Sequence, residues 1–391
     1  MQTRVYMDYN ATAPLLQQAR DAMLSSMEEL GNPSSVHKEG QQARRIINSA
    51  RDHLAKLCSA EPTHITFTSG ATEAATHLLT PNYKMGRSAL KVSKLYVCAV
   101  EHPCLLSGGR FSPEDIVVIG VDENGCINLD ELEAELVQHD QSQGLPMLAL
   151  QAANNETGVL QPIQQAIACA RSHNALVVID AVQLLGKKPI SIAEMDADFL
   201  IVSSHKIGGP KGVGAIISKG EILMPSPLIV GGGHEKGHRA GTENLIGISG
   251  FGAACEVALE NLHVFQEIGN KRNQLEQKMQ NLAPDLVIHG RGVERIDNTT
   301  CFTLPGMKSE TLQIAFDMEG IAASSGSACS SGKVGESHVL VAMNADAKSG
   351  ALRVSLGPKT SDEDVDRFLQ VFEKTNERRL SRQSAELAAS S

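Results

Sequence analysis

The sequence of 391 residues lacks several features that would assign it to a specialised class of protein. It has no tryptophan, only 3% aromatic residues, and no uninterrupted apolar stretch near the ~18 residues that a membrane-spanning helix needs. Residues 1–10 also lack the basic and then apolar segments of a secretory signal. These absences predict an ordinary globular protein of the cytoplasm, with no membrane partner.

The cysteines and the net charge exclude two further classes. The eight cysteines form no CxxC pair and follow no regular spacing, which excludes a disulfide framework and a zinc site. We therefore predict no metal centre. A net charge of -10 argues against a nucleic-acid-binding surface, which needs clustered Lys and Arg to contact phosphates. A small-molecule substrate suits this composition better.

Short apolar runs alternate with segments of helical spacing in the first part of the chain. Helical patterns cover Leu129–Gln138 and Gln164–His173. The predicted buried strands are Leu95–Val100, Ile116–Val121, Met147–Gln151, Leu176–Asp180, Phe199–Ser203 and Gly214–Ser218. This alternation predicts an α/β fold with a mostly parallel sheet covered on both faces. Ligands of such folds bind at the carboxyl ends of the strands.

The pattern changes after Gly250. A long helix-like stretch runs from Phe251 to about Leu282, and strands follow near Leu286–His289 and Asn298–Leu304. These segments predict a second, smaller α/β domain, because a chain of 391 residues exceeds the size at which one core keeps growing. The last residues, Arg378–Ser391, are rich in Arg, Ser and Ala and are predicted to fray.

Two predicted strands end in residues with the chemistry of a cofactor site. One ends in Asp180, and the other runs into His205 and Lys206 before a Gly-rich stretch. A lysine amine forms a Schiff base with the aldehyde of pyridoxal 5′-phosphate, and a carboxylate keeps the pyridine nitrogen protonated. We predict these roles for Lys206 and Asp180, against the alternative of a surface lysine before a turn. Candidate phosphate ligands lie in the same segment: Ser203, Ser204 and His205.

A second phosphate-binding element is predicted at Thr66–Glu73, where a short strand ends in Ser-Gly and a helix begins. Backbone N–H groups at a helix N-terminus, here near Ala71 and Thr72, suit a dianionic phosphate, as does the Thr72 hydroxyl. A Ser-Gly-x-Thr turn alone is more often an ordinary helix cap. The phosphate-binding interpretation of this element depends on the motif around Lys206 elsewhere in the chain.

Other polar residues follow the predicted strands. His102 lies two residues beyond the strand Leu95–Val100, where it can stack on the cofactor ring and shuttle protons; the alternative is a histidine that caps a loop. Asn155 lies in the segment NNETG, and its amide, like that of Gln183, can bind the substrate or the phenolic oxygen of the cofactor. A turn filled by Asn and Gly is the alternative for NNETG.

A small-residue loop, Ser324–Gly332, carries Cys329. Flanking Ser and Gly residues indicate exposure, and an exposed cysteine can act as a thiolate nucleophile, although a plain turn would accept serine equally well. Arg353 follows in the segment LRVSLG, where its guanidinium can bind the α-carboxylate of a substrate through two hydrogen bonds. A Gly-rich loop at Gly231–Gly233 can approach phosphate closely or can be a plain linker.

Taken together, these motifs resemble the cysteine desulfurases of the NifS/IscS type, which belong to the class V aminotransferase group. The resemblance spans residues 5 to about 375, and the matching segments are MDYNATAP, GNPSSVHKEG, SGATE, EHP, NNETG, DAVQ, SSHKIGGPKGVGA, GGGHEKGHRAGTEN, SSGSACSSG and LRVSLG. It implies a pyridoxal-phosphate-dependent transferase of fold type I. A large domain, residues 15–257, would contain a mostly parallel seven-stranded sheet. Residues 1–14 and 258–391 would form the smaller α/β domain.

The resemblance also implies a homodimer, in which Thr242 reaches the phosphate of the cofactor bound by the partner subunit. Asn155 and Arg353 would orient the substrate. Gln183 would contact the ring oxygen and His102 would stack on the ring. The cofactor ligands implied within one chain are Ala71, Thr72, His102, Asn155, Asp180, Gln183, Ser203, His205 and Lys206.

The reaction of the family removes sulfur from L-cysteine, releases alanine and leaves a persulfide on Cys329, with Lys206 and His102 as the other catalytic residues. The sulfur then passes to an acceptor or scaffold protein for iron–sulfur clusters or thiolated cofactors. Cys104, two residues after His102, is unexpected and is predicted to be structural. Two enzymatic alternatives stay open, a selenocysteine lyase and a class V aminotransferase without sulfur transfer. A non-catalytic binding module would leave Lys206 and Asp180 unexplained.

Overall fold

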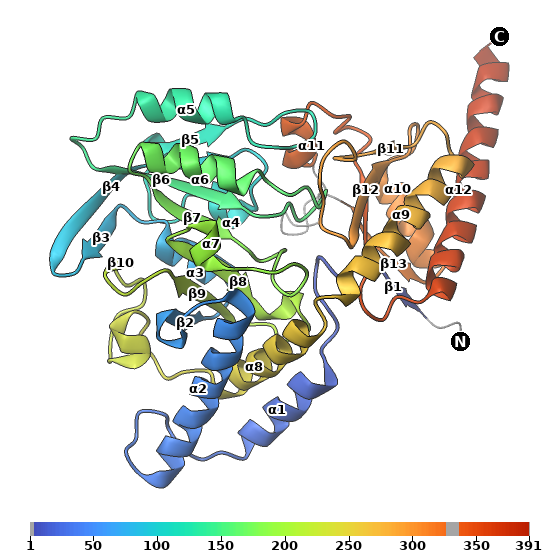
Figure 1. The fold of residues 1–391 in the computed structure, drawn as a ribbon. Coiled ribbons are helices and arrows are strands. Elements are labelled where there is room, and N and C mark those ends of the chain that lie inside the picture. The colour runs from blue at the N-terminus through green and yellow to red at the C-terminus, as the bar shows by residue number, and fades with distance from the viewer. Residues whose placement is uncertain (1–3, 326–335, 391) are drawn as a thin grey trace.

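The computed structural model describes residues 4–325 and 336–390, and these residues form a larger and a smaller part (Figure 1). Each part is built around its own sheet. Cys329 lies outside the described residues. Within them, no single helix is long and apolar enough to cross a membrane. Only the bent pair α8 (Leu245–Glu260) and α9 (Val264–Leu282) has the length and composition that a spanning segment needs.

The larger sheet confirms the predicted mostly parallel arrangement. Strands β5, β4, β6, β7 and β8 are parallel neighbours, and β9 runs antiparallel between β8 and β2. The bounds are β2 Ile65–Thr68, β3 Asn82–Met85, β4 Ser88–Cys98, β5 Ile116–Ile119, β6 Leu145–Gln151, β7 Leu176–Asp180, β8 Phe199–Ser203, β9 Gly214–Ser218 and β10 Leu223–Pro225. All six strands predicted for this region are present, and five of them begin and end within two residues of the prediction, whereas β4 begins seven residues before the predicted Leu95.

The sheet has nine strands, two more than the seven that were expected. The additional strands are β3, which pairs antiparallel with the first half of β4, and β10, which pairs with β3. The second half of β4, from Leu95, pairs with β5 instead. A strand of 11 residues is long enough to have both neighbours on one side. The extension was missed because its residues are mostly exposed and lack an apolar run.

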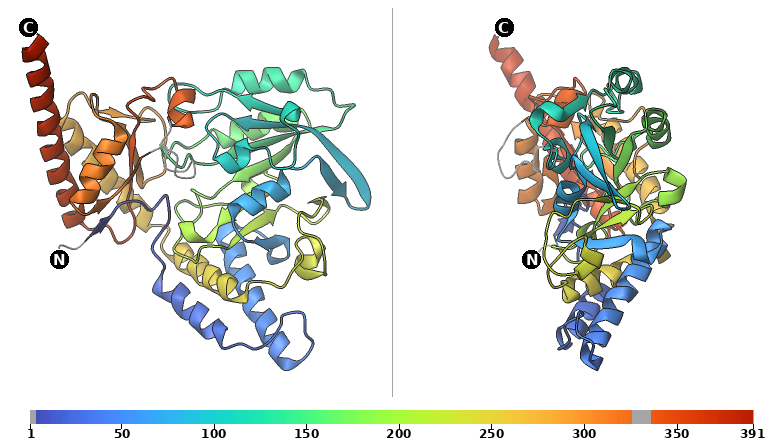
Figure 2. Two further views of the ribbon diagram at one scale, coloured as in Figure 1. Left: turned by 180° about the vertical axis from the view of Figure 1, so that it is seen from behind. Right: turned by 90° about the vertical axis from the view of Figure 1, so that its left-hand side faces the viewer.

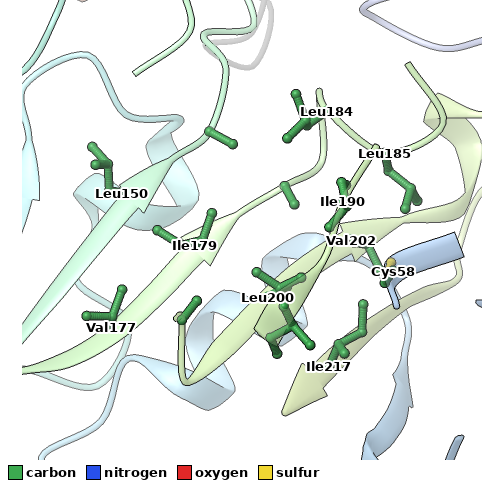
Figure 3. Close-up of a cluster of buried hydrophobic side chains, with 14 of the residues drawn as sticks. Cys58, Leu150, Val177, Ile179, Leu184, Leu185, Ile190, Leu200, Val202 and Ile217 are labelled. Atoms are coloured by element: carbon green, nitrogen blue, oxygen red, sulfur yellow. The ribbon is translucent and has the colours of Figure 1, made fainter. Parts of the chain in front are cut away.

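Helices cover both faces of this sheet. Alternate side chains of each strand point to opposite faces, and apolar side chains on both faces need to be buried. Val177 and Ile179 of β7 join a buried cluster with α2 (Lys38–Cys58), α5 (Leu129–Val137), α6 (Ile163–Ser172) and α8 (Leu245–Glu260). Figure 3 shows part of this cluster, in which Cys58 is buried. Leu176 and Val178 join a second cluster with α3 (Ala71–Leu78) and α4 (Pro103–Leu106). Short α7 (Ile192–Met195) lies between β7 and β8 in the chain.

The predicted single helix over Phe251–Leu282 is wrong, because the chain bends by 73° between α8 and α9 (Val264–Leu282). Asn261 ends α8: its backbone N–H bonds the carbonyls of Val257 and Ala258, and its side chain donates to Val257 O at 2.7 Å. The bend lets α8 pack on α1 (Gln17–Met27) and α2, while α9 packs on α12 (Asp362–Ser390). One polypeptide segment therefore serves both parts of the molecule.

The smaller part has a four-stranded sheet in the order β11, β12, β15, β14. Its core is rich in phenylalanine, with Phe316 and Phe368 stacked at 4.6 Å between ring centroids. The N-terminal strand β1 pairs with β13, so the start of the chain belongs to this core. The bounds are β1 Val5–Tyr6, β11 Val287–Ile288, β12 Thr299–Thr303, β13 Ile321–Ala322, β14 Ser324–Ser325, β15 Leu352–Ser355, α10 Ser309–Met318 and α11 His338–Ala342.

The C-terminal segment was predicted to fray, but it is helical up to Ser390, and Ser391 lies outside the described residues. Helix α12 continues to Ser390 along the outer edge of the smaller part (Figure 2). Arg379 ties it down from a buried position, with bonds to the Asp285 carboxylate and to the carbonyl of Pro305. A buried, fully bonded arginine explains why a polar stretch can remain helical here.

Candidate active site

A cavity of about 540 Å³ opens at the carboxyl ends of the parallel strands, where the alternation of strands and helices predicted a ligand site. Three of its lining residues, Asn10, Ala11 and Thr12, come from the N-terminal segment. The structure brings together nine predicted site residues in the wall of this cavity, namely Ala71, Thr72, His102, Asn155, Asp180, Gln183, Ser203, His205 and Lys206.

Asp180 is the last residue of β7 and is buried at the base of the site. Its Oδ1 accepts the backbone N–H of Val182 at 2.9 Å. Burial raises the pKa of the Asp180 carboxyl to about 6, although the Val182 N–H and the charge of Lys206 oppose the shift. A buried carboxylate of this kind gains strongly from a cationic partner, such as a protonated pyridine nitrogen.

Lys206 lies in the short 3-10 turn Ser204–Lys206 that follows β8. Its Nζ donates to the backbone carbonyls of Asn10 at 2.6 Å and of Ala11 at 3.0 Å. The neighbouring His205 shares a hydrogen bond between Nδ1 and the Thr12 hydroxyl. Burial and then the charge of Lys206 lower the pKa of His205 to about 4, so this ring is neutral at pH 7. The N-terminal segment therefore holds the lysine amine at the edge of the cavity.

His102 caps α4 with its own ring. Nδ1 accepts the backbone N–H of Cys104 at 3.2 Å, so Nδ1 is an acceptor and the proton of the neutral ring is on Nε2. Burial, followed by the charges of Lys206 and His338, lowers the pKa of His102 to about 4. Cys104 also lines the cavity, and its Sγ is 3.0 Å from the same Nδ1. Burial raises the pKa of the Cys104 thiol, which therefore stays protonated.

The predicted phosphate element is open toward the cavity. The backbone N–H groups of Ala71 and Thr72 begin α3 and have no acceptor among the residues that the structure describes. A Cβ added at Gly70 or at Gly212, both of which line the cavity, would meet no atom within 4 Å. The two N–H groups and the free space beside the glycines fit a bound phosphate.

These features together fit the three chemically different ends of pyridoxal 5′-phosphate. Asp180 offers a carboxylate to the ring nitrogen, Lys206 offers an amine to the aldehyde, and the start of α3 offers N–H groups to the phosphate. The three groups lie in the wall of one cavity, as a single cofactor with three chemically different ends requires.

Three of the predicted residues that the structure describes do not line this cavity, namely Ser204, Arg353 and Thr242. Arg353 is buried, and its guanidinium donates to Asp8 Oδ1 at 2.7 Å and to the backbone carbonyl of Asn155 at 2.9 Å. Thr242 is exposed on the surface of the chain. Cys329 is outside the described residues, but both flanks of its segment approach the site. Ser324 donates to Asp8 at 2.6 Å, and Ser337 donates to Glu156 at 2.7 Å.

Comparison with known proteins agrees with this geometry. The sequence model of the class V aminotransferases matches residues 5–368. The chain is a member of this family. Class V aminotransferases depend on pyridoxal 5′-phosphate, which is therefore the cofactor of this enzyme.

The relatives of this class V enzyme match it over nearly its whole length. The cysteine desulfurase IscS of Dictyoglomus turgidum is 34% identical, and the match covers 97% of this chain and 96% of the relative. A cysteine desulfurase of Cereibacter sphaeroides is 38% identical over 94% and 95% of the two chains. The solved NifS-like protein from Rickettsia africae has a TM-score of 0.85 and 31% identity, and covers 96% of this chain and 99% of its own. The predicted fold class is confirmed.

Sequence reasoning missed two contributions to the site of this class V enzyme. Asn10 and Ala11 hold Lys206, yet their segment, MDYNATAP, was noted only as a matching motif. Lys187 is buried and bonds two site residues, and nothing in the surrounding GKKP distinguishes it from the partly exposed Lys188. Burial of a single lysine depends on residues far away in the sequence, so no local signal was available.

Proposed function

We propose that this class V enzyme is a cysteine desulfurase, which takes sulfur from L-cysteine, releases alanine and carries the sulfur as a persulfide on Cys329. The observation that carries the proposal is the near-complete match to proteins named cysteine desulfurases, at 33–38% identity. The cavity supports it, because its wall holds the amine, the carboxylate and the phosphate site that the chemistry requires.

Within the proposed site, each residue has one task. Pyridoxal phosphate, when bound, supplies an electron sink for the bonds broken at the substrate carbon. Asp180 keeps its ring nitrogen protonated, and Ala71, Thr72, Ser203 and His205 bind its phosphate. Lys206 moves the proton at the substrate Cα. His102, neutral at pH 7 with the proton on Nε2, covers the ring and donates from that atom.

Substrate binding and sulfur transfer fall to three further residues. We propose that Asn155 and Arg353 orient the α-carboxylate of the substrate, since Arg353 carries the charge and is held beside Asn155 by Asp8. The Cys329 thiolate attacks the substrate sulfur. The carbon–sulfur bond breaks as the sulfur–sulfur bond forms, and the electron pair left on carbon takes up a proton.

The same proposal covers the assembly. The enzyme would be a cytoplasmic homodimer in which Thr242 of one subunit completes the phosphate site of the other, and an acceptor or scaffold protein would take the sulfur. Residues 15–257 would form the cofactor-binding domain. Residues 1–14 and 258–391 would form the domain that carries Cys329.

Mass spectrometry after incubation with L-cysteine tests the proposal. We expect the peptide that contains Cys329 to gain the mass of one sulfur atom while alanine appears, and we expect Cys329→Ser to lose both products. Cys126→Ser is the matched control, because Cys126 lies outside the cavity lining. Sulfide release from L-cysteine that persists in Cys329→Ser would overturn the mechanism. A much faster turnover of selenocysteine than of cysteine would favour a selenocysteine lyase.

A further inference from the structure

Lys187 is a buried lysine for which the established chemistry has no use. Only 4% of the surface of Lys187 is exposed, and no carboxylate among the described residues pairs with its amine. Its Nζ donates to Oδ1 of Asn10 at 3.0 Å and to Oε1 of Gln183 at 2.9 Å. Burial and the charges of Lys206 and Arg353 hold the pKa of Lys187 well below its usual range. A group buried at this cost needs a physical explanation.

The two bonds decide how the Gln183 amide is oriented. A lysine amine donates to both neighbours here, so the Gln183 atom that faces it is the amide oxygen. The amide nitrogen then points the other way. One of its two hydrogens bonds the Asn10 carbonyl at 3.1 Å, and the second has no acceptor in the described part of the chain. Because Gln183 lines the cavity, this second N–H is available to a ligand there.

Asn10 is fixed by the same lysine. Its side-chain oxygen accepts from Lys187 and also from Asn298 at 3.2 Å, while its nitrogen donates to Thr299 at 2.8 Å. The backbone carbonyl of Asn10 is the acceptor for Lys206. Lys187 therefore joins Asn10, which holds the amine of Lys206, to Gln183, which presents an N–H to the cavity.

We propose that Lys187 is a positioning residue that clamps Gln183 to the Asn10 segment, so that Gln183 presents its free N–H to the phenolic oxygen of the cofactor. The proposal rests on the proposed function only for the place of the ring in the cavity. An N–H on that oxygen stabilises its anionic form. Loss of the donor makes the oxygen hold the neighbouring proton more tightly, and raises the pH at which the absorption of the bound cofactor changes.

Lys187→Met tests the clamp, because methionine keeps much of the length of lysine and removes both donors. We expect the pH midpoint of the cofactor absorption to rise by about one unit, the size expected for one buried hydrogen bond. Lys188→Met is the matched control: Lys188 is partly exposed and pairs with Asp297, so its midpoint should equal that of the wild type. An unchanged midpoint in Lys187→Met overturns the proposal.

A double-mutant cycle separates positioning from a direct effect of the Lys187 charge. If Lys187 acts through Gln183, then Gln183→Met raises the midpoint by itself and adding Lys187→Met raises it no further. Additive shifts would contradict the clamp. The titratable groups His102, Asp180 and His205, whose pKa values respond to the charge of Lys206, are unchanged in every variant.

Two checks keep the outcome decisive. Thermal unfolding of the cofactor-free protein shows whether Lys187→Met folds. If it does not, Lys187→Leu replaces it, which also removes both donors, and an unchanged midpoint would again overturn the clamp. The wild-type protein should show a cofactor absorption band that Lys206→Ala abolishes. Absence of this band would overturn the proposed cofactor site together with the clamp. An unchanged midpoint with a normal band overturns the clamp alone.

Discussion

At the scale of single residues, the site depends on carboxyl groups whose pKa values burial has raised. The pKa of Asp180 is raised to about 6, while the pyridine nitrogen needs its ionised form. We expect the affinity of the cofactor-free protein for pyridoxal phosphate to fall by about tenfold between pH 7 and pH 5, because binding there must first release a proton. Equilibrium dialysis at both pH values measures this. Asp180→Asn should bind weakly at both, and an equal pH dependence in that variant would contradict the assignment.

Glu156 gives a second prediction, which concerns stability. It is buried, accepts the Ser337 hydroxyl, and has a pKa raised from 4.5 to about 7 by burial. Below pH 4.5 the carboxyl is protonated in both the folded and the unfolded chain. As the pH rises from 4.5 through 7, the unfolded chain loses this proton more readily, so the stability that the protonated carboxyl contributes is progressively lost.

Glu156→Gln should therefore be more stable than the wild type at pH 8, by roughly 1–3 kcal/mol in the free energy of unfolding, because glutamine stays neutral and still accepts from Ser337. The difference should nearly vanish at pH 4.5. Urea unfolding at the two pH values provides the measurement. Glu123→Gln, at an exposed position, is the control and should show no such pH-dependent gain. Equal stability of Glu156→Gln and wild type at pH 8 would contradict the raised pKa.

At the scale of secondary-structure elements, the sequence predicted what depends on local pattern. Strands β7, β8 and β9 begin and end where their apolar runs do, because both faces of each strand are buried. The break between α8 and α9 was missed, since Asn261 is neither Gly nor Pro and helical spacing continues beyond it. Strand β3 was missed because its pairing with β4 leaves polar side chains exposed.

The same distinction applies to the site. Asp180, Lys206 and Thr72 were found because they follow apolar strands, and parallel strands bring their carboxyl ends to one edge. Lys187 and Asn10 were not found, because they meet only through contacts between residues 177 positions apart. Only the folded chain shows that contact.

The end of α12 gives a prediction at this scale, because its stability depends on Arg379. The guanidinium bonds Asp285, Pro305 and Asn376 from a buried position. We expect Arg379→Met to lower the free energy of unfolding by about 1–3 kcal/mol, since it removes the donor to the buried Asn376 side chain and to the partly buried Pro305 carbonyl. Arg378→Met, at the exposed neighbouring position, should have little effect. Similar urea midpoints for the two variants would show that Arg379 does not hold the helix.

At the scale of the whole molecule, the described chain leaves the proposed phosphate site without Thr242. This residue is exposed and does not line the cavity of its own chain. In a dimer with twofold symmetry, a residue that acts across the interface does so twice, so each site would combine Lys206 of one subunit with Thr242 of the other. Variants of these two positions should therefore complement each other.

Coexpression of two inactive variants tests this arrangement. Lys206→Ala lacks the amine, and Thr242→Asp places a carboxylate against the dianionic phosphate, so each should be inactive when it is expressed alone. A mixed dimer has one site with both wild-type residues. If half of the dimers are mixed, we expect activity of about a quarter of the wild-type value per subunit. Size-exclusion chromatography with light scattering verifies that each variant forms dimers. A coexpressed pair that is dimeric but inactive would mean that Thr242 does not serve the partner site. In that case each subunit of a mixed dimer has one defect in its own site, and no site is intact.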